Sequence, residues 1–170
     1  EAQSFRALAS SLRAERTPAE RLSAGVARLR ASLGADLAVL FRLDAANRVV
    51  SIITQDGAPV LQGEGLYLLP ESPVGDVIRE NEVLLRRRVS SDRTGRFRNL
   101  LAVVDFESCI GIPLEAGGMV EHALFLFTRQ PDTFGSNRLR EALAVAVLLQ
   151  SVLESQVLDE RVLAAGQLLL

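Results

Sequence analysis

The stretch that decides the fold reads Phe106-Glu107-Ser108-Cys109-Ile110-Gly111-Ile112-Pro113-Leu114, then Glu115-Ala116-Gly117-Gly118, then residues 120–128. Every second residue of its first part falls on one face, because side chains alternate with period two in a β-strand. Gly117 and Gly118 supply the positive φ angles that a chain reversal needs. Pro113 cannot donate a ladder hydrogen bond, so we expect the first strand to fray near its end. The whole stretch predicts a β-hairpin.

A helix and two strands are predicted upstream of the hairpin. Thr17-Pro18-Ala19-Glu20 combines a capping box with a proline at the first helical position. Apolar residues then recur at helical spacing as far as Gly34, which suits the position after a helix. Residues 36–43 are apolar but too few for a helix, so they predict a buried strand. A turn over residues 44–47 leads to a returning strand over residues 48–55.

The other expected elements complete an antiparallel arrangement. They are a first helix over residues 3–15, a short strand at 66–69, a helix from Ser72-Pro73 to about Asn81, a strand at 83–89, and a long helix over about 137–166 with Ser136 as its N-cap. Runs of antiparallel strands flanked by helices give an α+β sheet rather than a doubly wound one.

The charge composition narrows the possible functions. The chain has 19 basic and 21 acidic residues, and this balance argues against nucleic acid as the main partner. All the basic residues are arginine, so no Schiff-base lysine, lysine general base or phosphate-loop lysine can form. A single cysteine permits no internal disulfide, which fits a reducing, cytoplasmic compartment.

Length and apolar runs indicate a single domain without a membrane segment. The 170 residues are a one-domain length with some helical extension. The longest apolar run, residues 142–149, is far shorter than the ~18 residues of a membrane span, so we expect no membrane contact. The chain starts at Glu1 without a methionine and ends within a helical pattern, so we expect a fragment of a longer protein.

Four strings resemble the GAF domain family in their order and spacing, over about residues 18–153. The family's first helix and first strand resemble Leu29-Arg30-Ala31-Ser32-Leu33-Gly34-Ala35-Asp36 followed by Leu40-Phe41-Arg42-Leu43-Asp44. Its S-x-x-G-x-x-h helix resembles Ser72-Pro73-Val74-Gly75-Asp76-Val77-Ile78, and its S-h-h-x-h-P-L strand resembles Ser108-Cys109-Ile110-Gly111-Ile112-Pro113-Leu114. The turn before its last helix resembles Arg129-Gln130-Pro131-Asp132-Thr133-Phe134. The resemblance implies an α+β, GAF-like antiparallel sheet of five or six strands. Helices would cover one face, a small-molecule pocket would lie on the other, and long helices would flank the domain at both ends.

The resemblance also implies a role and a division of the chain. Such modules sit in bacterial sensor kinases, transcription activators, chemoreceptors or second-messenger enzymes, where they control a neighbouring output domain. We therefore expect a linker and dimerisation helix over residues 1–16, a sensory domain over 17–153 and a signalling-helix extension over 154–170.

Four departures from the family bear on its local packing, its ligand and its activity. The family usually has a glycine in its last strand where this chain has His122. The Asn-Lys-x-Phe-Asp-Glu signature of cyclic-nucleotide-binding members cannot occur without lysine. Bilin-binding members use a cysteine usually followed by histidine, whereas Ile110 follows Cys109. Members that reduce free methionine sulfoxide use more than one cysteine.

A pocket covered by residues 91–99 is the expected ligand site. Its candidate polar contacts are Tyr67, Arg96, Arg98, Asp105, Glu107 and Cys109. Arginine forks match carboxylate and phosphate, so an anionic ligand is conceivable, while a solvated sheet edge is the commoner meaning of the run Arg86-Arg87-Arg88. Cys109 in an apolar strand favours a small buried hydrophobe over a redox thiol. His122 favours a structural role over a haem ligand or pH sensor.

The last helix predicts a dimer. Residues 142–149 are apolar on every side, and a single sheet cannot cover such a helix all round. Apolar residues continue beyond the length that a compact domain needs. An intermolecular helix bundle explains both facts, and the alternative is a truncated helix that ends against its own domain. The expected contact residues are Leu8, Leu12, Val147, Val152, Leu153 and Val157.

Together these features predict a non-catalytic regulatory module. The sequence shows no nucleophile–base pair, metal-ligand cluster or phosphate loop, so we expect no enzyme activity, no metal and no required cofactor. Binding of an unknown small molecule to the homodimer would shift the helices and so signal to an attached output domain. The alternatives are a ligand-free interaction scaffold and a haem or redox module built on Cys109 or His122.

Overall fold

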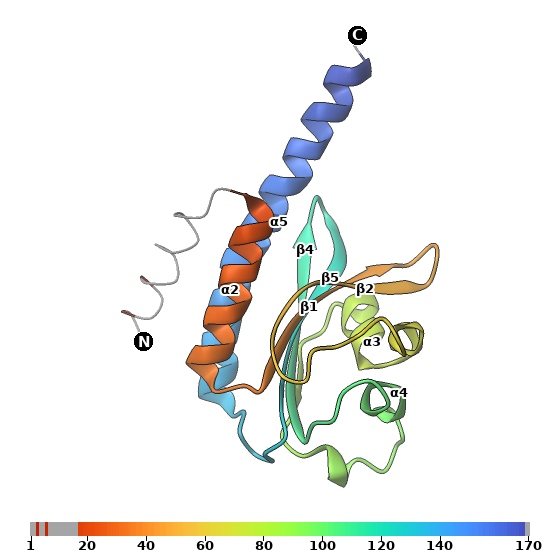
Figure 1. The fold of residues 1–170 in the computed structure, drawn as a ribbon, viewed down its shortest axis with the longest axis vertical. Coiled ribbons are helices and arrows are strands. Elements are labelled where there is room, and N and C mark those ends of the chain that lie inside the picture. Colours follow the sequence, from red (N-terminus) through yellow and green to blue (C-terminus); the bar gives the residue numbers. More distant parts are fainter. Residues whose placement is uncertain (1–2, 4–5, 7–16, 169–170) are drawn as a thin grey trace.

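The computed structural model describes residues 3, 6 and 17–168 (Figure 1). The expected first helix, with its dimer residues Leu8 and Leu12, falls almost entirely outside the described residues. Only Gln3 and Arg6 of that segment are described, and both are helical and exposed.

A five-stranded antiparallel sheet forms the centre of the molecule. Its strands are β1 Leu37–Asp44, β2 Val49–Gly57, β3 Leu84–Arg86, β4 Ser108–Ala116 and β5 Met119–Thr128. They lie in the order β2-β1-β5-β4-β3. The central position therefore belongs to β5, the second strand of the hairpin. This confirms the α+β class and a sheet of five strands.

The hairpin forms where the sequence predicts it. Strands β4 and β5 pair from Ser108 opposite Thr128 to Ala116 opposite Met119, with a register shift after Leu114. Gly117 and Gly118 have φ angles of 62° and 79°.

Two details of the hairpin prediction are wrong. Strand β4 continues past Pro113 without fraying, because β3 pairs with it only as far as Gly111 and the missing N–H then interrupts no ladder on that side. Phe106 precedes the strand, and its side chain packs on the opposite face from Ile110 and Ile112.

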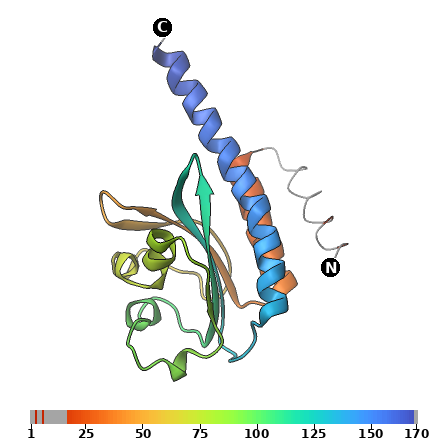
Figure 2. The ribbon, with the colours of Figure 1, turned by 180° about the vertical axis from the view of Figure 1, so that it is seen from behind.

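Two long helices cover one face of the sheet, α2 Pro18–Leu33 and α5 Ser136–Leu168 (Figures 1 and 2). Their apolar side chains pack against alternate residues of the strands, such as Leu40, Leu124 and Leu126. The α2 helix begins with the predicted capping box, in which Thr17 accepts from the Glu20 backbone, and ends at Gly34 with φ 64°. An N-cap of this kind stabilises a protein by about 1 kcal/mol.

Short elements cover the other face. They are the 3₁₀ helices η1 Leu66–Glu71 and η2 Val89–Ser91, and the helices α3 Pro73–Glu80 and α4 Arg98–Leu101. A second core cluster lies beneath them, and it contains Phe41, Phe97, Phe106, Phe125 and Phe127. The sheet thus separates an aliphatic helix layer from an aromatic layer that is covered mainly by loops.

The sequence-based predictions fail mainly in this second layer. The strand expected at residues 66–69 is instead η1, in which Gly65 provides a left-handed start and Pro70 removes a ladder donor. The strand expected at residues 83–89 shortens to β3 because the chain turns into η2 at Val89. The helix expected from Ser72-Pro73 forms, with Ser72 as its N-cap and Asn81 as its C-cap.

Helix α5 has 33 residues and starts at Ser136, so Ser136 is its first helical residue rather than its cap. Figures 1 and 2 show its C-terminal half extending beyond the sheet. By length and composition it is long and apolar enough to cross a membrane, with a mean hydropathy of 1.4 over its best window, of which 33% is buried inside the domain. A core helix passes the same test, so this hydropathy does not assign α5 to a membrane.

Candidate functional site

Arg86 and Cys109 are neighbours on the loop-covered face of the sheet. The two residues are paired across β3 and β4, so their side chains share one face. The guanidinium carbon of Arg86 lies 5.1 Å from the centre of the Phe97 ring, a cation–π contact. Phe97 comes from the segment just before α4, within residues 91–99, here called the covering loop. The contact therefore joins the edge strand β3 to the covering loop.

Two polar atoms in this region have no hydrogen-bond partner within the described part of the chain. They are Arg86 Nε and Asp92 Oδ2, and both are buried. The other Asp92 oxygen accepts from the Thr94 hydroxyl at 2.7 Å and from the Thr94 backbone at 3.1 Å. These bonds lower the pKa of Asp92. One unpaired donor and one unpaired acceptor are what a small polar molecule could satisfy.

The Cys109 thiol is unreactive in this environment. Its side chain is fully buried, and burial raises the pKa of the thiol to about 12, although the Arg86 charge partly offsets this shift. A thiol with so high a pKa is almost entirely protonated at neutral pH and is a poor nucleophile.

The other predicted pocket residues do not gather around Cys109. Tyr67 is 79% exposed on η1. Arg96 forms ion pairs with Asp76 at 3.2 Å and Glu80 at 3.9 Å. Asp105 is exposed and 3.7 Å from Arg129.

The two remaining residues of the predicted pocket are Glu107 and Arg98. Glu107 accepts a hydrogen bond from the Ser90 backbone at 2.6 Å, and Arg98 is exposed at the start of α4. The structure therefore places Tyr67, Arg96, Arg98 and Asp105 at the surface and Cys109 in the core, and a pocket formed by the six residues stays a prediction. Arg86 and Asp92 were not predicted as site residues. Arg86 belongs to the arginine run interpreted as a solvated sheet edge, and Asp92 lies in a loop without a motif of its own.

Aromatic side chains fill much of the space beneath the covering loop. Phe106 lies between Phe97 and Phe127, with ring centres 6.2 and 5.0 Å apart. Neither of the two surface hollows described below is lined by the predicted pocket residues.

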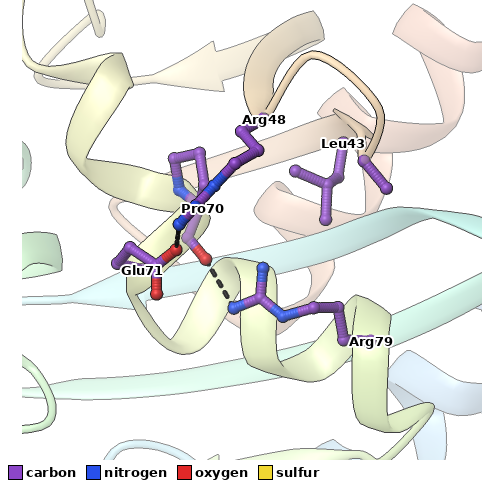
Figure 3. A pocket seen from close by; sticks show the side chains of 6 residues that line it. Leu43, Arg48, Pro70, Glu71 and Arg79 are labelled. Carbon is purple, nitrogen blue, oxygen red and sulfur yellow. Dashed lines mark hydrogen bonds and ion pairs between the residues drawn. The ribbon is translucent and has the colours of Figure 1, made fainter.

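One hollow of about 300 Å³ lies where the β1–β2 turn meets η1 and α3 (Figure 3). Its lining residues are Leu43, Ala45, Arg48, Pro70, Glu71 and Arg79. A second, more open hollow lies between α2 and β2, and its lining includes Ala19, Ser23 and Thr54.

The predicted dimer residues divide into covered and uncovered ones. Val152 and Leu153 are 8% and 3% exposed and pack in the core of their own domain, so within this chain they offer little surface to a second copy. The all-apolar stretch of α5 has α2 as well as the sheet to cover it. Val157 is half-buried against the same core. Val147 is 68% exposed.

The tip of the β4–β5 hairpin holds α5 where that helix leaves the sheet. Gln150 accepts from the Glu115 backbone at 3.0 Å, and Glu154 accepts from the Gly117 backbone at 2.9 Å. Arg161 donates to the Gly117 carbonyl at 3.2 Å. The hairpin and three turns of the helix are therefore linked by hydrogen bonds.

His122 lies on the helix-covered face of β5, opposite Arg42 and Leu114. Burial, with a smaller contribution from the Arg42 charge, lowers the pKa of His122 to about 4. The described residues contain no group of three or more His, Cys, Asp or Glu side chains that could hold a metal ion. The imidazole is thus a neutral core group at pH 7.

The sheet order, its helix layer and its loop-covered face define a small α+β domain. The GAF domain family profile matches residues 17–153, and the chain belongs to the GAF domain family. No curated protein sequence matches it significantly.

Solved structures share this fold. The GAF domain of a phosphoenolpyruvate-protein phosphotransferase from Acinetobacter is 18% identical with a TM-score of 0.75, over 94% of this chain and 96% of that one. Its counterpart from Coxiella burnetii is 19% identical with a TM-score of 0.72, over 96% and 95%. A free methionine-R-sulfoxide reductase from Neisseria meningitidis, solved with its substrate, is 15% identical with a TM-score of 0.70, over 92% and 87%.

Proposed function

We propose that this chain is a non-catalytic regulatory domain that dimerises through α5 and controls an attached output domain in bacterial, cytoplasmic signalling. The observation that carries the proposal is an exposed stripe without charge along α5. Its residues, here named the α5 stripe, are Ala144, Val147, Ser151, Ser155, Leu158, Val162 and Ala165.

The spacing of the α5 stripe suits pairing between helices. Its members recur every three or four residues, the repeat of a helix that packs along another helix. Val147, Leu158 and Val162 are 68%, 54% and 70% exposed. A second copy of the chain would remove these side chains from water at about 25 cal/mol per Å² of apolar surface. The same pairing would place the C-terminal ends of two helices side by side, where they can act on an output domain.

The chemistry of the site supports a non-catalytic role. Cys109 is buried with its thiol pKa raised to about 12, and it is the only cysteine of the chain. The likeness to the methionine sulfoxide reductase concerns the fold, because the identity is 15%. A small molecule that satisfies Arg86 and Asp92 beneath the covering loop would serve as an input signal rather than as a substrate.

Sedimentation equilibrium of matched variants tests the dimer. We expect the wild-type chain to be a dimer and Val162→Glu to shift it to a monomer, because a charge would be buried in the α5 stripe. Leu163→Glu is the control, since Leu163 is 67% exposed and lies outside the stripe. A wild-type monomer, or equal effects of the two variants, would overturn the proposal.

A second candidate function is a ligand-free dimerisation scaffold. The aromatic packing of Phe97, Phe106 and Phe127 favours it, because these rings occupy the space beneath the covering loop. Native mass spectrometry, repeated under denaturing conditions, separates the two functions. A dimer with the added mass of a small molecule supports a sensor, and a dimer that gains no mass with any candidate ligand supports a scaffold.

A further inference from the structure

We propose that the hollow between the β1–β2 turn, η1 and α3 binds a small organic monoanion, whose acidic group lies between Arg48 and Arg79. Its apolar part would lie on Leu43, Ala45 and Pro70. Figure 3 shows the two arginine side chains entering the hollow from different elements. The inference rests on the proposed function only in making this anion a second input of the module, separate from any small molecule that binds Arg86 and Asp92 beneath the covering loop.

Arg79 is held in place by one of its guanidinium nitrogens. Nη2 donates to the Pro70 carbonyl at 2.6 Å and to Asp76 at 3.3 Å. Its Nε and Nη1 make no hydrogen bond within the described part of the chain. Arg79 therefore combines a fixed position with free donors, which is what recognition of a carboxylate or phosphate requires.

Arg48 reaches the hollow from the opposite side. Its Nη2 pairs with Glu71, and its Nε and Nη1 have no partner among the residues that the structure describes. The backbone of Arg48 has a φ of 53°, a left-handed conformation that non-glycine residues adopt rarely.

The backbone around the hollow is fixed before any ligand arrives. Asp44 accepts from the Asn47 backbone at 3.1 Å and from its side-chain amide at 2.7 Å, which closes the turn that carries Arg48. Gly75 allows α3 to approach η1, because a Cβ there would lie 2.1 Å from the Pro70 carbonyl oxygen. This close approach places the carbonyl that orients Arg79.

Charge and size define the class of ligand. Arg48 and Arg79 bring two positive charges to the lining and Glu71 brings one negative charge. Asp76 also pairs with Arg79 at 3.3 Å, but it is shared with Arg96 at 3.2 Å, so it neutralises Arg79 only in part and a ligand of a single negative charge fits the site. A volume of about 300 Å³ is at the small end of ligand pockets, which span roughly 300–1,000 Å³. Because both guanidinium groups remain in contact with water, we expect affinities on the order of millimolar.

Titration followed by NMR of the arginine Nε–H signals tests the site directly. We expect butyrate to give saturable shifts of Arg48 and Arg79, inorganic phosphate to bind the same arginines more weakly for want of an apolar part, and neutral butyramide to give none. Arg79→Gln should weaken butyrate binding about tenfold, as expected for loss of a charge-assisted hydrogen bond. Arg28→Gln is the control, because Arg28 is an exposed arginine on α2 and should bind like the wild type.

Two further variants separate binding from folding. Glu71→Gln removes the residue that competes for Arg48 and should tighten butyrate binding several-fold, an increase that a purely structural role does not produce. Ala45→Phe fills the hollow without removing a charge and should abolish binding. Absence of saturable shifts, equal affinities of the Arg79 and Arg28 variants, or weaker binding by Glu71→Gln would overturn the proposal. Because the shifts report binding in monomer and dimer alike, their absence is distinct from failure of the sedimentation test.

Discussion

The two faces of the sheet are built differently. The face under α2 and α5 is sealed by two long helices and packed mostly with aliphatic side chains such as Leu29, Leu124 and Leu149. The other face is covered by helices of at most eight residues and by loops, and it contains the unpaired polar atoms of Arg86 and Asp92. We therefore expect the helix-covered face to be the more rigid of the two.

The largest expected effect is on the helix-covered face. Leu29 is fully buried, and Leu29→Ala should lower the free energy of unfolding by about 3–4 kcal/mol, because the helix layer cannot collapse into the cavity. Leu100→Ala on the loop-covered face makes the same change at an equally buried side chain and should cost only about 2 kcal/mol, because the covering loop can move into the cavity. Urea denaturation measures both. Equal costs would contradict the contrast between the faces.

The next effect concerns pH and His122. The folded pKa of about 4 lies below the unfolded value of ~6.5, so between these values the unfolded chain binds more protons. The stability from this group is complete above about pH 6.5 and is lost as the pH falls toward 4, with about 2 kcal/mol lost between pH 7.5 and pH 5.

Comparison with His122→Leu isolates the contribution of His122 to the pH dependence of stability. The carboxylates titrate in both proteins, so their contribution cancels. Urea denaturation at pH 7.5 and pH 5 should show the variant losing about 2 kcal/mol less than the wild type. An identical pH dependence would mean that the imidazole is hydrated in the folded protein.

A smaller effect tests the link between the hairpin tip and α5. A Cβ on Gly117 would lie 2.9 Å from Val157 and from Arg161, whereas a Cβ on Gly118 would meet nothing within 4 Å. Both glycines have positive φ angles, so Gly118→Ala should cost about 1 kcal/mol of strain alone. Gly117→Ala should cost roughly 1 kcal/mol more, because the Val157 and Arg161 side chains must move away from the added methyl group. Thermal unfolding of the two variants measures the difference, and equal costs would show that the tip does not hold the helix.

The smallest effect is expected at Arg96, which the sequence placed in the ligand pocket. Its ion pairs with Asp76 and Glu80 are exposed, and such pairs contribute about 0–1 kcal/mol. Arg96→Gln should therefore change the free energy of unfolding by less than about 0.5 kcal/mol and leave ligand binding intact. A large loss of stability would mean that the loop-covered face depends on this pair.

Elements with local sequence signals could be predicted before the structure was known. The period-two pattern with Gly117-Gly118 predicted the hairpin, the Thr17–Glu20 capping box predicted the start of α2, and the order of elements with the four family-like strings predicted the α+β class. The structure agrees with these predictions because each signal depends only on neighbours a few residues away in the chain.

Only the tertiary structure decided which side chains meet. Val152 and Val147 look alike in the sequence, yet one lies in the core and the other in the α5 stripe, because the position of α2 selects the face of α5 that is covered. Arg48 and Arg79 are far apart in the chain and share a hollow, since the β1–β2 turn and α3 are brought together through the sheet and η1. Contacts across such distances depend on how layers pack, and no local pattern records that packing.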